Sequence, residues 1–219
     1  MIDSVRVIGA GRVGSAVTAR LAERGIDSRD DADVILLCVP DAAIRDVARG
    51  LTPGHAWIGH TSGATPLSAL DPHERRFGLH PLQSFTRARG PEQLNGASAA
   101  VTAETDEARD VGFELARRLG LEPFALAEAD RALYHAGAVI ASNYLVTLHR
   151  AAAEILAEVG APVAGLRPLM QGVIDNDFEL TGPIARGDWT TVDRHLDAIR
   201  KRKPRLESLY RVLAAATAP

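Results

Sequence analysis

Short apolar runs alternate with turns over the first forty residues of the chain. Val5, Val7 and Ile8 form one such run, and residues 9–14 after it read GAGRVG. Apolar residues then recur at helical spacing over residues 15–23. This pattern predicts a buried parallel strand that turns sharply into an amphipathic helix.

The turn has the GxGxxG spacing of a dinucleotide-binding site. In such a turn Gly9 permits the tight bend, Gly11 lets the backbone approach a pyrophosphate, and Gly14 allows the helix to pack closely on the strand. The free N–H groups at the start of the helix also favour an anion. We therefore expect a dinucleotide-type architecture, with a glycine turn that binds nothing as the alternative.

Further apolar runs predict the rest of a parallel sheet and its helices. The expected strands are residues 33–39, 55–59, 77–79, 98–101 and 122–126, and the expected helices are residues 42–49 and 106–119. Only residues 26–32 lie between Gly25, just after the first helix, and Asp33, where the next strand begins, whereas a parallel crossover needs about a dozen residues. The usual second strand and helix are therefore missing. Asp27, Asp30 and Asp31 lie near the distance from the glycines that a ribose-binding acid has, so each is a candidate for that role, but no strand aims them at a ribose.

Strand signals stop near residue 129, and the rest of the chain has helical periodicity. The expected helices are residues 130–159, 162–177, 189–201 and 204–216. The first is more than twice the average helix length and is rich in alanine, which permits close helix packing. We expect a truncated Rossmann-like parallel sheet domain in residues 1–128, an all-α domain in residues 129–219, and a homodimer formed through the C-terminal helices.

Composition excludes several classes of protein. The net charge of −3 gives no electrostatic reason to expect a nucleic-acid partner. The sequence has neither an apolar stretch of about 18 residues free of charge nor a basic-then-apolar leader, so we expect a cytoplasmic protein without a membrane span.

The single cysteine, Cys38, lies in an apolar run and is expected to be a buried strand residue. The basic cluster at residues 200–205 is either a solvated helix end or a phosphate-binding patch.

A polar stripe runs along the long predicted helix. Arg131, His135, Ser142 and His149 lie within about 40° of one face at 100° per residue, and Asn143 lies about 80° from His135. One interpretation is that His135 and Asn143 are buried polar groups satisfied by neighbouring backbone. The other is that the stripe faces the cleft under the glycine turn, where the histidine exchanges a proton with a substrate and the asparagine orients that substrate.

A loop with glycine and proline, residues 180–188, interrupts the helical region. Arg186 in this loop has the planar fork that grips a carboxylate, although pairing with Asp188 explains it equally well. Asp188 itself precedes a predicted helix and is most simply its N-cap.

Four histidines could suggest a metal site, and Ser62 could suggest a nucleophile, but their sequence contexts support neither role. His55, His60, His80 and His135 lack short ligand spacing, so we expect no metal. Ser62 lacks the GxSxG elbow of a nucleophilic serine and is expected to be a loop residue close to a ligand.

Longer motifs resemble one bacterial family. These motifs are GAGRVG, LLCVPDAAI, HTSGA, GLHPLQSF, YHAGAVIASNYLVTL and LTGPIARGD. Together they span nearly the whole chain and resemble proteins in which a Rossmann-like domain precedes the helical domain DUF2520. These proteins look like relatives of the 6-phosphogluconate dehydrogenase and pyrroline-5-carboxylate reductase group of NAD(P)-dependent oxidoreductases.

The resemblance implies roles for particular residues. It implies a cofactor, NADP or NAD, over Gly9, Gly11, Arg12, Val13 and Gly14, with Val39, Pro40 and Asp41 near the nicotinamide half. The residues it places beside the cleft are His60, Thr61, Ser62 and His80. Position in the wider superfamily implies His135 and Asn143 as catalytic residues, although relatives often use lysine there.

We therefore expect an NAD(P)-dependent oxidoreductase that acts on a small carbonyl, imine or hydroxy acid, with His135 as proton donor and Arg186 as anion anchor. The missing strand and helix remove half of the adenosine pocket, which leaves the choice among NAD, NADP and a deazaflavin open. The alternative is a non-catalytic dimeric binding protein with a degenerate nucleotide site.

Overall fold

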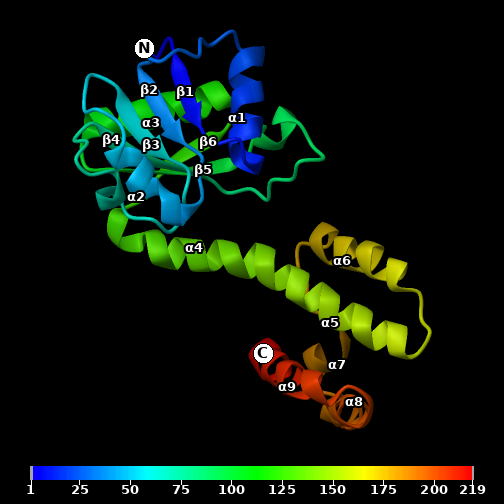
Figure 1. Ribbon diagram of the computed structural model, residues 1–219. Helices are drawn as coiled ribbons and strands as arrows, with labels where there is room; N and C mark the ends of the chain where they lie inside the picture. The colour runs from blue at the N-terminus through cyan, green and yellow to red at the C-terminus, as the bar shows by residue number, and fades with distance from the viewer. Residues whose placement is uncertain (1, 219) are drawn as a thin grey trace. The chain divides into compact units, whose positions relative to one another are not determined.

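A computed structural model describes residues 2–218 of the chain (Figure 1). Its contacts divide the chain into two compact units, Met1–Ile140 and Ala141–Pro219, and the division falls within the long helical segment. Residues 131–139 therefore belong to the same unit as the sheet. None of the helices in the described part of the chain is long and apolar enough to cross a membrane.

Six strands form one sheet in the described part of the first unit, in the order in which they occur along the chain. They are β1 (Val5–Ile8), β2 (Val34–Leu37), β3 (Trp57–His60), β4 (Arg76–Pro81), β5 (Ser98–Ala103) and β6 (Glu122–Ala125). The strands β1 to β4 are parallel, as expected, whereas β5 is antiparallel to β4 and β6 is parallel to β5. The chain reverses direction because only the 3₁₀ helix η2 (Pro91–Leu94), and no crossover helix, joins β4 to β5.

Helices cover both faces of this sheet (Figure 1). One face, which carries Val34 and Leu36, packs against α1 (Arg12–Glu23) and α3 (Asp106–Leu119). The other face, which carries Ile35 and Leu37, packs against α2 (Asp41–Arg49) and the 3₁₀ helix η1 (Leu67–Leu70). Successive strand residues point to opposite faces, and both faces of β2 are buried, which explains its continuous apolar run.

The second strand of the usual dinucleotide fold is reduced to a single bridge. Asp27 pairs with Ser4, and its carbonyl oxygen accepts a hydrogen bond of 2.8 Å from the Val5 amide. The chain then enters β2, which pairs directly with β1. Because Ser4 precedes β1 and Gly9 follows it, Asp27 lies at the end of the strand opposite the glycine turn. The side chain of Asp30 lies 3.4 Å from that of Arg6 in β1, so its ion pair is with β1 and not with a second strand.

Helices make up the described part of the second unit. The long predicted helix is α4 (Arg131–Val139), a π-helical segment (Ile140–Tyr144) and α5 (Leu145–Glu158), and it begins in the first unit. It is followed by α6 (Leu166–Asp175), α7 (Gly182–Ala185), α8 (Trp189–Arg202) and α9 (Glu207–Thr217). A small apolar cluster of Val192, Leu196 and Ala214 joins α8 to α9.

The basic cluster at residues 200–205 is paired with acidic side chains. Arg200 lies 2.9 Å from Glu207, and Lys203 lies 2.8 Å from Glu158. Arg202 also pairs with Glu158. These pairs neutralise much of the positive charge, which favours a solvated helix end over a phosphate-binding patch.

Candidate active site at the strand ends

Two glycines of the first turn are required by close backbone packing. Gly9 has a φ of +115°, and a Cβ atom there would collide with the carbonyl oxygen of Cys38. A Cβ at Gly14 would collide with the carbonyl oxygen of Gly9 and would lie 3.1 Å from the Cβ of Cys38. The turn is thus pressed against the end of β2, where the Cys38 amide donates a hydrogen bond of 2.8 Å to Ile8.

Gly11 differs from these two glycines because a Cβ atom there would make only an ordinary van der Waals contact. The nearest atom to a Cβ built there is the Cys38 carbonyl oxygen, at 3.9 Å. Gly11 is also the N-cap of α1, and no side chain caps the amide groups of the first turn of that helix. The turn therefore presents uncapped N–H groups beside a position without a side chain, an arrangement that suits an anionic group.

Val39, Pro40 and Asp41 continue from β2 into α2, next to the glycine turn. Asp41 is the first residue of α2 and is exposed. Burial lowers the pKa values of both His80 and Arg131. The negative charge of Asp41 opposes this effect at each group but is weaker than burial. Cys38 is buried, and burial raises the pKa of its thiol to about 12, so it is the inert strand-end residue that the sequence predicts.

The third and fourth strands bring two predicted histidines to one face of the sheet. Register aligns Leu37, His60 and Gly78 across β2, β3 and β4, so these residues point to the face covered by α2. His80 lies two residues beyond Gly78 and shares that face. His60 is fully buried, and His80 is partly buried.

Arg131 at the start of α4 reaches this face of the sheet. Its guanidinium donates a hydrogen bond of 2.7 Å from Nη2 to the carbonyl oxygen of Ser62. The side chain is 5% exposed, and no described residue forms a hydrogen bond with its Nε, from which the Glu128 carboxylate is 3.9 Å away. Burial lowers the pKa of Arg131 from its usual value. Arg131 belongs to the polar stripe that the sequence predicts on the long helix. Only the structure shows that Arg131 brings a buried positive charge to the strand ends.

The imidazole of His60 lies beside this charge. Neither ring nitrogen has a partner in the described structure. Burial lowers its pKa to about 3, and the charge of Arg131 adds to this effect. His60 is therefore neutral near pH 7 and does not act there as a positively charged acid.

His80, Tyr134 and His135 form the most open part of the cluster. His80 Nδ1 lies 2.9 Å from the Tyr134 hydroxyl oxygen, and the His80 and His135 rings meet edge to face with centroids 5.9 Å apart. The position of a Cβ on Gly63 would lie 2.9 Å from His80 Nε2 and 2.6 Å from His135 Cδ2. The bare Gly63 thus leaves room for both rings. Tyr134 is a site residue that sequence reasoning missed, although it directly precedes His135.

Ser62 contributes its backbone and not a free hydroxyl. Its Oγ donates to Thr65 Oγ1 at 2.9 Å and accepts from the amides of Thr65 and Ala64 at 2.9 and 3.2 Å. The serine is 6% exposed, and its carbonyl oxygen accepts the hydrogen bond from Arg131. The hydroxyl is committed to forming the turn that follows β3.

The other two predicted site residues belong to the second unit. Asn143 lies exposed in the π-helical segment, where its Oδ1 accepts from Ser142 Oγ at 3.3 Å. Arg186 is exposed at the end of α7. Asp188 caps α8 by accepting from the Thr191 amide at 3.0 Å, as the sequence predicts. The roles of Asn143 and Arg186 remain predictions.

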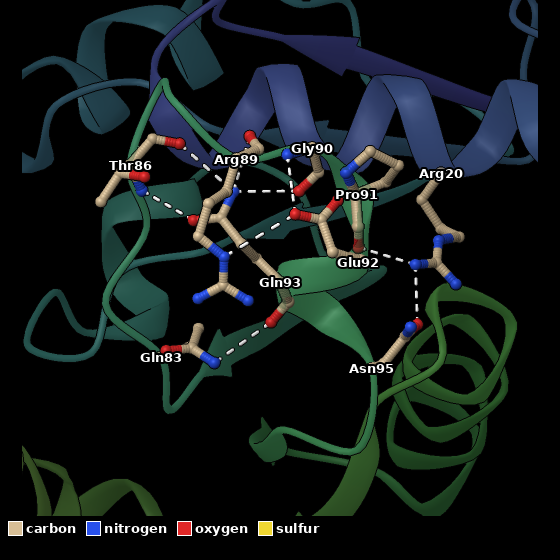
Figure 2. Close-up of polar contacts among 9 residues, drawn as sticks. All are labelled: Arg20, Gln83, Thr86, Arg89, Gly90, Pro91, Glu92, Gln93 and Asn95. Carbon is tan, nitrogen blue, oxygen red and sulfur yellow. Dashed lines mark hydrogen bonds and ion pairs between the residues drawn. The ribbon is translucent and has the colours of Figure 1, made fainter. Parts of the chain in front are cut away.

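The segment after β4 is held by one buried glutamine (Figure 2). Gln93 Oε1 accepts from the Thr86 amide at 2.8 Å, and its Nε2 donates to the Gly90 carbonyl at 2.9 Å. Arg20 of α1 donates to the Pro91 carbonyl at 2.7 Å. These bonds tie the loop that follows the predicted HPLQSF motif to α1, the helix that begins at the glycine turn.

Comparisons with known proteins agree with this architecture. The model of a domain of unknown function, DUF2520, matches residues 97–217. None of the curated proteins compared matches the chain. A Bacteroides fragilis protein, BF3122, whose description proposes an NADP oxidoreductase, has a TM-score of 0.82 at 20% identity, with coverage of 99% of this chain and 98% of that one.

Two further solved structures share the fold. Protein TM1727 of Thermotoga maritima has a TM-score of 0.79 at 22% identity, with coverage of 97% of this chain and 96% of that one. An NADH-preferring ketol-acid reductoisomerase from an uncultured archaeon has a TM-score of 0.68 at 14% identity, with coverage of 98% and 82%. At these identities the likeness is one of fold.

Proposed function

The chain belongs to the DUF2520 family, and we propose that it is a nicotinamide-dependent oxidoreductase whose site lies at the carboxyl ends of β1 to β4. One observation carries the proposal. The uncapped start of α1 with its bare Gly11 stands at the same edge of the sheet as a cluster of ionisable side chains. Ligands of open parallel sheets bind at this edge. The names of structural neighbours that use NADP or NADH support the same reading.

The residues of the glycine turn fit the diphosphate of NADP or NAD. Gly9 and Gly14 admit no side chain, Gly11 leaves the approach open, and Arg12 and Val13 follow in the first turn of α1. Such a cofactor would supply a hydride to a neighbouring carbon. In residues 2–218, which the structure describes, no second strand holds an acid near this turn, since Asp27 pairs at the far end of β1. We therefore expect the adenosine half to contribute less to affinity than it does in complete dinucleotide folds.

The proposed substrate is a small carbonyl compound, imine or hydroxy acid. We assign proton exchange to His135, which lies beside His80 at the open side of the cluster. Arg131 supplies a positive charge that favours an anionic substrate or a developing oxyanion. Asn143 and Arg186 of the second unit are proposed to orient the substrate and to bind its carboxylate.

We also propose that the protein is a homodimer through its C-terminal helices. The second unit exposes large apolar side chains, among them Tyr144 at 57%, Leu169 at 66% and Phe178 at 69%. Leu169 and Val173 lie four residues apart on α6, and both are exposed. Extensive exposed apolar surface is typical of interaction sites. A second copy of the chain is the partner that we propose for this surface, because most soluble oligomers are homo-oligomers and twofold dimers are the commonest of them.

One observation favours a second candidate function. In the described part of the chain, a single bridge between Ser4 and Asp27 stands where the usual fold has a second strand, the strand that carries the ribose-binding acid. A dimeric binding protein with a degenerate nucleotide site would retain the glycine turn for packing or for a smaller phosphate compound.

Titration of the purified protein with NADPH and NADH distinguishes these functions. Nicotinamide fluorescence and thermal unfolding are followed together, because a ligand that prefers the native state must raise its stability, by about 2.7 kcal/mol at 100 times Kd. Saturable binding with a matching rise in Tm supports the oxidoreductase. No binding of either compound at millimolar concentration would reject it in favour of the binding protein.

A further inference from the structure

His80 is held at one ring nitrogen and free at the other. Nδ1 lies 2.9 Å from the hydroxyl of Tyr134, and the two rings meet edge to face at 5.5 Å. Nε2 has no hydrogen-bond partner from the described part of the chain and lies against the bare Cα of Gly63. His80 is only partly buried, and Nε2 is not among the fully buried side-chain atoms, so it keeps access to solvent although its ring packs closely against Gly63.

Chemistry decides the direction of the hydrogen bond between these rings. A phenol is a stronger donor than a neutral imidazole N–H, and a bare imidazole nitrogen is a stronger acceptor than a phenol oxygen. The Tyr134 hydroxyl therefore donates to Nδ1 of His80. A neutral imidazole carries one proton, so this proton lies on Nε2.

The groups around His80 keep it neutral. Arg131, Tyr134 and His135 face it from α4, Asp41 faces it from α2, and His60 lies on the neighbouring strand. Burial, with the charges of His135 and Arg131, lowers the pKa of His80 to about 4, while Asp41 acts weakly in the opposite direction. His80 is then a hydrogen-bond donor that does not release its proton near pH 7.

We propose that Tyr134 is a positioning residue that holds His80 in the neutral tautomer with its proton on Nε2, so that His80 donates a hydrogen bond to a carbonyl or carboxylate oxygen of the substrate. Only the identity of that oxygen rests on the proposed function. A fixed neutral donor stabilises negative charge as it develops on an oxygen, which is the role of an oxyanion site. The proton itself comes from another group, and His135 is the neighbour assigned to that task.

Nitrogen NMR of protein labelled with ¹⁵N at histidine tests the tautomer without any assay of activity. The His80 signals are assigned by their loss in His80→Gln. We expect an unprotonated Nδ1 and a protonated Nε2 near pH 7, and we expect Tyr134→Phe to convert His80 to a mixture of tautomers. The matched control is Tyr210→Phe, because Tyr210 binds Nδ1 of His195 at 2.7 Å in the second unit. This control should leave the His80 signals unchanged.

The donor role is tested by titration with acetate, glyoxylate, pyruvate and glycolate. At least one of these probes should shift the His80 Nε2 signal, and Tyr134→Phe should weaken its binding roughly three- to tenfold, as expected for one hydrogen bond. A proton on Nδ1 in the unsubstituted protein, an unchanged tautomer in Tyr134→Phe, or no shift with any probe would each overturn the proposal. If Tyr134→Phe does not fold, the tautomer of His80 in the unsubstituted protein still decides whether the proposal holds. If neither NADPH nor NADH binds, the proposed oxidoreductase function is rejected. The His80 signals, and with them the test of the tautomer, do not depend on that result.

Discussion

The guanidinium of Arg131 occupies the space that a side chain at residue 78 would need. A Cβ built on Gly78 would lie 2.7 Å from Arg131 Nη1 and 3.4 Å from His60 Cε1. Glycine in the middle of β4 thus allows α4 to place a buried charge against the sheet, next to the end of β3. A strand glycine usually weakens a sheet, so close approach of another group is its simplest physical explanation here.

Gly78→Ala is therefore expected to displace Arg131 and to break its hydrogen bond with Ser62. Overpacking and one lost buried bond together should lower the free energy of unfolding by about 1–3 kcal/mol. Urea unfolding followed by circular dichroism measures this change. Gly54→Ala is the control, because a Cβ at Gly54 meets its nearest atom at 4.0 Å. Equal stability of the two variants would show that Arg131 does not depend on Gly78.

Gly11→Leu is expected to prevent binding at the start of α1 while leaving the protein folded. A Cβ at Gly11 would lie 3.9 Å from its nearest neighbour, the Cys38 carbonyl oxygen, so it causes no internal clash, but the larger side chain fills the approach to the uncapped amides. NADPH affinity should fall at least tenfold, with little change in the Tm of the free protein. Gly54→Leu, an equivalent change in another open glycine, serves as the control. Undiminished NADPH binding would place the diphosphate elsewhere.

His135→Ala tests the assigned proton donor. In a reduction identified by a substrate screen, kcat should fall by about 10²- to 10⁴-fold, because general acid catalysis contributes that much. NADPH affinity should stay within about threefold, since the change is confined to the histidine cluster. His149→Ala, on α5 of the second unit, is the matched control. Undiminished kcat in His135→Ala would show that another group donates the proton.

The buried histidines predict a pH dependence of stability. The pKa values of His60 and His80 in the folded protein are about 3 and about 4, below the value of about 6.5 in an unfolded chain. Between these values the unfolded chain binds more protons, so the free energy of unfolding should fall as the pH drops from 6.5 towards 4. His80 alone should contribute on the order of 3 kcal/mol to this loss.

Urea unfolding between pH 4 and pH 7 measures this effect. His60→Gln should flatten the dependence on pH, because glutamine does not titrate. His55→Gln is the control, since His55 is exposed. An identical slope in the protein with and without His60 would show that this histidine is not held neutral by its surroundings.

Leu169→Asp is expected to dissociate the proposed dimer. A buried leucine contributes about 1.5–3 kcal/mol, so a charge at this exposed apolar position should raise the dimer Kd at least tenfold. Sedimentation equilibrium measures Kd, and Thr18→Asp on α1 is a control on an exposed residue of the first unit. A monomeric unsubstituted protein would reject the dimer itself.

The sequence by itself determined most of the local structure, because local structure depends on neighbouring residues. The run from Val5 to Ile8, the glycine turn and the helix Asp106–Leu119 all occur where periodicity predicts them. Thr105 caps that helix, and Gly120 ends it with a φ of +84°. The absence of the usual second strand and helix also followed from the length of one connecting segment, since residues 26–32 are too few for a crossover.

Only the tertiary structure decided which side chains meet at the strand ends. The bond between His80 and Tyr134 joins residues 54 positions apart, and the bond between Arg131 and Ser62 joins residues 69 positions apart. Such contacts depend on strand register and on the rotation of α4 about its axis, which local patterns leave open. The same reason explains Asp27, whose distance from the glycines fits a ribose-binding acid but whose bridge to Ser4 holds it at the opposite end of β1.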